Sequence, residues 1–188
     1  ILDLSMNGQQ PMLSPDGKVI LTMNGEIYNA FDFKAELIKW GYCFKSTSDT
    51  EIVLALYLRY GFRGLLDRLN GMFAIVVIDL LQRKIYLARD RFGIKPMYYI
   101  LTSETFTFSS ELKSFKFIDG FSFNLNMENL DEYLIFRNNM QATLFKDIQS
   151  LTPGQCLSFT LDNGLEKGYF FDLNSLERSQ QITGIIEQ

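Results

Sequence analysis

The sequence predicts an α+β fold in which helices cover antiparallel strands, and two observations lead to this prediction. Apolar runs of strand length follow one another through the middle of the chain, at residues 72–79, 84–88, 97–101 and 105–109. Apolar residues at helical spacing are gathered before these runs, at residues 30–40, 48–60 and 63–69. Such grouping favours separate layers of helix and antiparallel sheet. With 188 residues, 47% of them hydrophobic, the chain is long enough for one domain with a full core.

The N-terminal part is predicted to hold two strands joined by a polar loop. Residues 1–4 have the composition of a strand end, and residues 5–17 are rich in the residue types that form turns. Residues 18–23 are β-branched and apolar, so they predict a strand that ends at Asn24 and Gly25.

The helical segments have recognisable ends. Ser48 and Glu51 have the spacing of a capping box, with Ser48 at the N-cap and Glu51 at the third helical position. This helix is predicted to stop at Gly61 and to be followed by a short helix over residues 63–69. Because residues 52–58 are apolar on nearly every side, we expect neighbouring elements to cover this helix all round.

Residues 72–79 form a continuous apolar run, typical of a strand that is buried on both faces. The three strands that follow are predicted to complete a meander with it. A hairpin is expected from residues 155–160 and 166–171, with short helices over residues 111–115 and 130–136.

Composition limits the partners and the chemistry. The net charge is −4 with both signs interspersed, so neither nucleic acid nor an anionic membrane is an expected partner. No apolar stretch has the length of a membrane span and no signal peptide is apparent, so a cytoplasmic location is expected. The chain has no histidine, which excludes Ser–His and Cys–His nucleophile pairs and histidine metal sites within these residues. Cys43 and Cys156 have mostly apolar neighbours and are predicted to be buried, inert thiols.

Two polar clusters have competing interpretations. Arg89, Asp90 and Arg91 resemble a phosphate-binding group, but their position between two strands favours a structural network of ion pairs around a turn.

Asn24 and Gly25 offer a side-chain amide and a glycine N–H, which are the donors that an oxyanion hole requires. Asn-Gly is also the commonest hairpin turn, and it recurs at 7–8, 70–71 and 163–164. The residues alone leave both interpretations of Asn24 and Gly25 open.

Five motifs in a fixed order add further information. They are Asn-Gly-Glu-Ile-Tyr-Asn at 24–29, Ser-Asp-Thr-Glu at 48–51, Leu-Asn-Gly-Met-Phe-Ala at 69–74, Ala-Arg-Asp-Arg-Phe-Gly-Ile-Lys-Pro-Met-Tyr-Tyr at 88–99 and Phe-Ser-Ser-Glu-Leu-Lys at 108–113. This series closely resembles the N-terminal glutaminase domain of glutamine-hydrolysing asparagine synthetases, a class II glutamine amidotransferase domain. The resemblance implies an N-terminal-nucleophile (Ntn) hydrolase fold, a four-layer α-β-β-α sandwich of two antiparallel sheets. It covers residues 1–173 as one domain and leaves 174–188 as a linker or the beginning of a synthetase domain.

The resemblance also implies a reaction, the hydrolysis of L-glutamine to glutamate and ammonia for ATP-dependent amide formation in a second domain. In this family an N-terminal cysteine attacks the amide, and its own α-amine acts as the base. Asn24 and Gly25 match the donors of the oxyanion hole. Position 1 is isoleucine, so the nucleophile is expected in a preceding segment and the 188 residues by themselves are expected to be inactive. The alternative is a degenerate, non-catalytic module with a packing or regulatory role.

The remaining site residues concern glutamine binding. Glu26 and Asp49 match family positions that hold the α-amino group, whereas Asp49 in a first helical turn would also stabilise the helix dipole. Ile1 and Leu2 match positions that line the pocket through main-chain atoms. The resemblance implies no metal or cofactor in this domain. It implies ATP and magnesium in the synthetase domain of the same polypeptide, and a possible homodimer.

Overall fold

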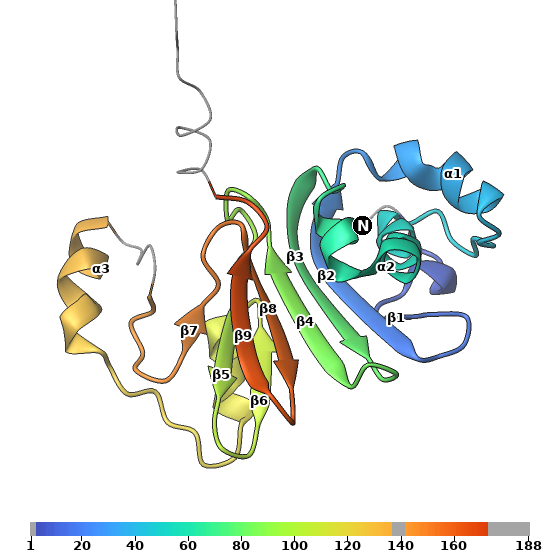
Figure 1. Ribbon diagram of the computed structural model, residues 1–188. Helices are drawn as coiled ribbons and strands as arrows, with labels where there is room; N and C mark the ends of the chain where they lie inside the picture. The colour runs from blue at the N-terminus through green and yellow to red at the C-terminus, as the bar shows by residue number, and fades with distance from the viewer. Residues whose placement is uncertain (1–2, 137–141, 173–188) are drawn as a thin grey trace, which may run out of the picture.

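The computed structural model describes residues 3–136 and 142–172 and contains two antiparallel sheets with helices on their outer faces (Figure 1). The larger sheet has, in spatial order, β1 (Met12–Leu13), β2 (Val19–Ile27), β3 (Gly71–Asp79), β4 (Lys84–Arg89), β8 (Gln155–Thr160) and β9 (Gly164–Tyr169). The smaller sheet has β6 (Phe106–Ser109), β5 (Tyr98–Leu101) and β7 (Gln149–Ser150). The predicted α+β class is confirmed.

The helices are short apart from one. Within the described residues the α-helices are α1 (Lys34–Lys39), α2 (Asp49–Leu66) and α3 (Leu130–Phe136). The 3-10 turns are η1 (Met6–Gly8), η2 (Ala30–Phe33), η3 (Leu112–Phe117) and η4 (Met127–Asn129). Helix α2 lies against β2 of the larger sheet and α1 packs against α2 (Figure 1). On the smaller sheet, Phe115 of η3 packs with Ile100 of β5.

The predicted meander is wrong, because the four strands divide between the two sheets. β3 and β4 pair in the larger sheet, whereas β5 and β6 pair in the smaller one. The chain changes sheets in the turn after β4. The two-residue strands β1 and β7 were not predicted, since neither has a pattern of its own.

Asp90 and Arg89 hold that turn together. The fully buried Asp90 carboxylate accepts the backbone N–H groups of Ile94 at 3.0 Å and Lys95 at 2.9 Å. The Arg89 guanidinium donates to the carbonyl oxygens of Gly93 and Lys95, both at 2.7 Å, and burial lowers its pKa from the ordinary arginine value. The predicted turn network is therefore confirmed, but its bonds run from side chains to backbone rather than from arginine to carboxylate.

Helix α2 confirms most of the predicted helix signals. Ser48 is the N-cap and its hydroxyl accepts the Thr50 N–H. Gly61 interrupts the helix with a φ of 69°, a left-handed value that favours glycine, so the two predicted helices meet there. The capping box is only half formed, because the Glu51 carboxylate accepts the N–H groups of Lys45 and Ser46 and not that of Ser48.

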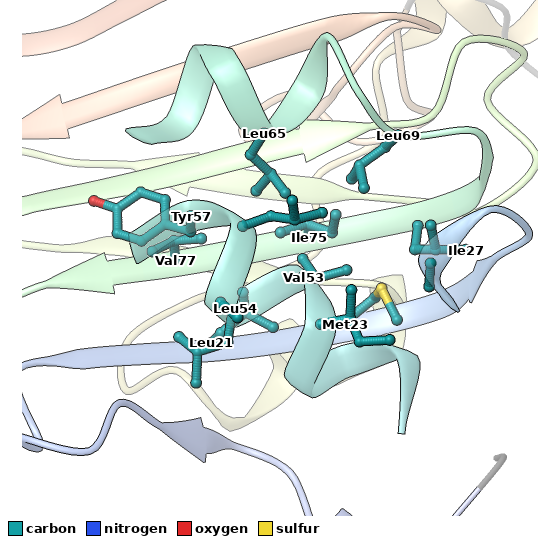
Figure 2. Packing of buried hydrophobic residues seen from close by; sticks show 14 of the residues in the cluster. Leu21, Met23, Ile27, Val53, Leu54, Tyr57, Leu65, Leu69, Ile75 and Val77 are labelled. Atoms are coloured by element: carbon teal, nitrogen blue, oxygen red, sulfur yellow. The ribbon is translucent and has the colours of Figure 1, made fainter. Parts of the chain in front are cut away.

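The main core lies between α2 and the larger sheet (Figure 2). Val53, Leu54 and Tyr57 of α2 meet Leu21 of β2 and Ile75 of β3. The alternate β3 residues turn to the other face, where a second cluster joins the two sheets. That cluster contains Ala74, Val76, Leu87, Met97, Tyr99, Leu151 and Leu157. Both faces of β3 are thus buried, as its continuous apolar run predicts.

Several predictions at the ends of the chain have other outcomes. Asp3 and Leu4 do not belong to a strand, and Ile1 and Leu2 lie outside the described residues. Residues 174–188 also lie outside them, so the domain boundary at 173 stays a prediction. The predicted β8–β9 hairpin forms, but its second strand begins at Gly164 and ends at Tyr169, two residues earlier than predicted at each end.

The first testable prediction concerns a buried hydrogen bond across the main core. The Tyr57 hydroxyl donates to the Asp79 carboxylate at 2.6 Å, and burial raises the pKa of this phenol. We expect Tyr57→Phe to lower the free energy of unfolding by about 2 kcal/mol, because a buried carboxylate loses a donor. Tyr86→Phe is the matched control, since that hydroxyl donates to the neutral Gln82 amide in an exposed position. Equal losses in urea unfolding would contradict the prediction.

Candidate functional site

Asn24, Gly25 and Glu26 lie inside β2 rather than beyond its end. Asn24 pairs with Ala74 and Gly25 pairs with Phe73, and the strand continues to Ile27. The prediction that the strand stops at Asn24 is therefore wrong. The strand can continue because glycine has no side chain, so that β3 approaches the backbone of β2 closely at this point. A Cβ at Gly25 would lie 2.0 Å from the Met72 carbonyl oxygen of β3.

The backbone of Gly25 faces the outer edge of β2. Its neighbour two residues before, Met23, uses both backbone groups on that edge, where its N–H donates to the Gln10 side chain at 2.6 Å and its carbonyl accepts from it at 2.9 Å. Two residues after Gly25, the Ile27 N–H donates to Asp49 Oδ2 at 3.0 Å. Because backbone groups of alternate residues point to the same side of a strand, the Gly25 N–H points to this edge too. The Gly25 N–H thus lies between the N–H groups of Met23 and Ile27, both of which already have side-chain acceptors.

The side chains of Asn24 and Glu26 share one face of β2, because they are two residues apart. Both are exposed, and neither makes a hydrogen bond or an ion pair within the described part of the chain. Asn24 lines a hollow of about 210 Å³ between the sheets, with Ala74 of β3 and Phe108 and Ser109 of β6. An amide, a carboxylate and a peptide N–H are thus available to an external molecule along one segment.

Asp49 is already engaged in the fold. It is the first residue of α2, it is 5% exposed, and its second carboxylate oxygen accepts the Thr50 N–H at 2.9 Å. With the bond from Ile27, this side chain fixes the start of the helix to the end of β2. Asp49 therefore stabilises the beginning of α2, in agreement with its predicted position in the first helical turn. Its contact with a substrate stays a prediction.

Ile1 and Leu2 lie outside the described residues, but the residue after them is well held. Asp3 Oδ2 accepts the Thr47 N–H at 2.8 Å, and hydrogen bonds from Ser5 and Thr47 lower the pKa of Asp3 to about 2. The segment that follows Ile1 and Leu2 is thereby tied to the loop that leads to Asp49. Sequence reasoning missed Asp3 and Gln10, because their partners lie 44 and 13 residues away and no local pattern reports such bonds.

The two cysteines take no part in this site. Cys43 is exposed in the wall of a hollow of about 640 Å³, so the prediction that it is buried is wrong. It lies in an irregular loop after Gly41, where apolar neighbours in sequence do not cover it. Cys156 is half-buried, and burial raises the pKa of its thiol. Both thiols are free.

A family model described as a glutamine amidotransferase domain matches residues 1–170. The chain belongs to this family. Asparagine synthetase [glutamine-hydrolyzing] 2 of Bacillus subtilis is 46% identical over 114 residues, which are 61% of this chain and 15% of that protein. Asparagine synthetase [glutamine-hydrolyzing] 1 of the same organism is 33% identical over 175 residues, 93% of this chain and 27% of that protein. The amidotransferase domain therefore spans less than a third of either relative.

Solved structures agree on the fold. Glutamine phosphoribosylpyrophosphate amidotransferase from B. subtilis superposes with a TM-score of 0.65 over 89% of this chain and 33% of that one, at 20% identity. The Ntn-hydrolase sandwich that the resemblance implied is thus confirmed. In the described residues no helix is long and apolar enough to cross a membrane, and no group of three cysteine or carboxylate side chains is arranged to hold a metal ion.

Proposed function

We propose that this amidotransferase domain hydrolyses L-glutamine to glutamate and ammonia within a larger protein that uses the ammonia to form an amide. The observation that supports this most directly is the pair of unoccupied donors on β2, the Asn24 amide and the Gly25 N–H. Family membership and the names of the B. subtilis relatives agree with it.

In the proposed reaction, the donors act on the charge that develops during amide cleavage. Attack on the glutamine carboxamide places negative charge on its oxygen, and two fixed N–H donors stabilise that charge more than they stabilise the ground state. The strand edge holds Gly25 without reorganisation, because Gln10 and Asp49 occupy the neighbouring backbone groups. The nucleophile is proposed to be an N-terminal cysteine of the longer protein. Its α-amine has a pKa near 8 and accepts the thiol proton in a chain segment that has no histidine.

Binding of the substrate is proposed to use charge. The glutamine α-ammonium would lie near the Glu26 carboxylate, which has no partner among the described residues, and near Asp49. The main chain of Ile1 and Leu2 would line the same pocket. The partner that consumes ammonia is proposed to be a synthetase domain of the same polypeptide with ATP and Mg²⁺, and the protein is proposed to be cytoplasmic and to form a homodimer.

The second testable prediction separates the two roles of Asp49. In the full-length protein we expect Asp49→Asn to raise the KM for glutamine about tenfold with little change in kcat, because an ammonium loses one charged partner. Stability should fall as well, since the new amide has a single acceptor oxygen for the N–H groups of Ile27 and Thr50. Asp67→Asn is the control, because that exposed carboxylate lies at the far end of α2, where its ion-pair partner among residues 3–136 and 142–172 is Arg63. Loss of stability without a change in KM would show that Asp49 is structural only.

The proposed function as a whole is tested with the full-length protein and glutamine labelled with ¹⁵N in the side-chain amide. We expect release of glutamate together with transfer of the label to the amide product. If ammonia supports amide formation and glutamine does not, the domain is the non-catalytic module instead.

A further inference from the structure

A second hollow lies far along the sheet from Asn24, where β7 of the smaller sheet approaches the β8–β9 hairpin. It has a volume of about 260 Å³ and shares no lining residue with the hollow beside Asn24. β9 forms the edge of the larger sheet opposite to β1, four places away from β2 (Figure 1). The hollow is therefore separate from the proposed glutamine site.

The charge of this hollow has the opposite sign to that of the chain. Lys146 and Lys167 line it, and no carboxylate lines it among the described residues, although the whole chain has a net charge of −4. A concave site with one sign of charge concentrates ions of the other sign. The lining thus favours an anion.

Gln155, at the start of β8, gives the hollow a fixed donor. This residue is 8% exposed and lines the hollow. Its Oε1 accepts the Thr152 N–H at 2.9 Å, which settles which end of the amide is oxygen. Its Nε2 donates no hydrogen bond within the described chain. This Nε2 is not fully enclosed by the described protein atoms, so it is open to the hollow and can donate to a ligand oxygen there.

Lys167, on β9, is held at the same hollow by two contacts. Its ammonium donates to Gln149 Oε1 at 2.9 Å and lies 5.5 Å from the centre of the Tyr99 ring. The Tyr99 hydroxyl donates to the same Gln149 oxygen at 2.5 Å, so β5, β7 and β9 position the lysine together. An ammonium has three donors, and two of them remain for a ligand.

We propose that this hollow binds a small oxyanion, a carboxylate or a phosphate, between the Gln155 amide and the Lys167 ammonium. The amide satisfies one oxygen by a neutral hydrogen bond and the lysine satisfies another by a charged one. The volume equals that of several waters at about 30 Å³ each, so a dicarboxylate or a phosphate fits.

The test is calorimetric titration of the full-length protein with sodium malonate and with sodium phosphate, at constant ionic strength made up with chloride. We expect at least one of the two anions to saturate a single site with a Kd of about 1 mM or tighter. Saturation by malonate alone identifies a carboxylate site, saturation by phosphate alone a phosphate site, and competition between the two a general oxyanion site.

Two variants and one control locate the binding. Lys167→Gln should weaken it at least about tenfold, because a charged hydrogen bond is lost. Gln155→Glu keeps an acceptor for the Thr152 N–H but replaces the free amide by a second oxygen, so it should abolish binding. Lys39→Gln removes the same charge from α1, away from the hollow, and should leave the affinity unchanged. The proposal is overturned if neither anion saturates, or if Lys167→Gln and Lys39→Gln weaken binding equally. Glutamine hydrolysis is measured in parallel, and its presence or absence does not bear on this result.

Discussion

Replacing Asn24 by alanine in the full-length protein is expected to lower glutamine-dependent amide formation about 100- to 1000-fold. The same variant should retain most of its ammonia-dependent activity, because added ammonia bypasses the hydrolysis of glutamine. The physical reason is the exposed Asn24 amide, which has no acceptor among the described residues and is therefore available to a developing oxyanion. Without the Asn24 amide, the Gly25 N–H is the one remaining donor of the proposed pair. Alanine is tolerated sterically, since Asn24 lines a hollow.

The two activities are measured side by side with saturating glutamine and with saturating ammonium. Asn163→Ala is the matched control, because Asn163 lies in the exposed β8–β9 turn, where its backbone N–H donates to Thr160 Oγ1 at 3.0 Å and alanine keeps that bond. Parallel loss of both activities in Asn24→Ala would indicate a damaged fold and would count against the oxyanion role. An unchanged glutamine-dependent rate would remove Asn24 from the mechanism.

Gly25→Ala is expected to destabilise the chain by about 3 kcal/mol or more. The added Cβ would meet the Met72 carbonyl oxygen at 2.0 Å and the Phe73 Cα at 2.7 Å, and both are backbone atoms that no side-chain rotation can move. In addition, φ at Gly25 is 151°, a value that alanine rarely adopts. β2 and β3 would have to separate at the point where the oxyanion donors lie.

Urea unfolding measures this loss, with the fluorescence of Trp40, the single tryptophan of the chain, as the signal. Gly164→Ala is the control, because Gly164 also has a positive φ of 73° but a Cβ there would meet nothing within 4 Å. It should cost only about 1 kcal/mol, the strain of the backbone alone. If the two variants lose the same free energy, the close approach of β2 and β3 is not a constraint.

The local signals in the sequence were reliable where a few neighbouring residues decide the structure. Ser48 caps α2 and Gly61 divides it, because a hydroxyl next to free N–H groups and a residue without Cβ act within one turn. The sequence failed where packing decides. Glu51 has the spacing to return to Ser48, yet it binds the N–H groups of Lys45 and Ser46, which the folded loop brings closer.

The candidate site shows the same division. The order of the five motifs was sufficient to assign the family, and it singled out Asn24, Gly25, Glu26 and Asp49. The motifs did not predict that β2 continues through Gly25, or that Gln10 and Asp49 occupy the backbone groups on either side of it. These bonds join residues 13 and 22 positions apart, and no local pattern encodes them.

By itself, then, the sequence determined the fold class, the family and the residue types at the site, because these follow from composition, periodicity and motifs along the chain. Only the tertiary structure decided which sheet each strand joins and which way the Gly25 N–H points. The physical reason is that strand pairing and edge hydrogen bonds depend on which distant segments meet. Here the buried Asp90 fixes the turn in which the chain passes from one sheet to the other, and the side chain of Gln10 binds the backbone of Met23 at the edge of β2.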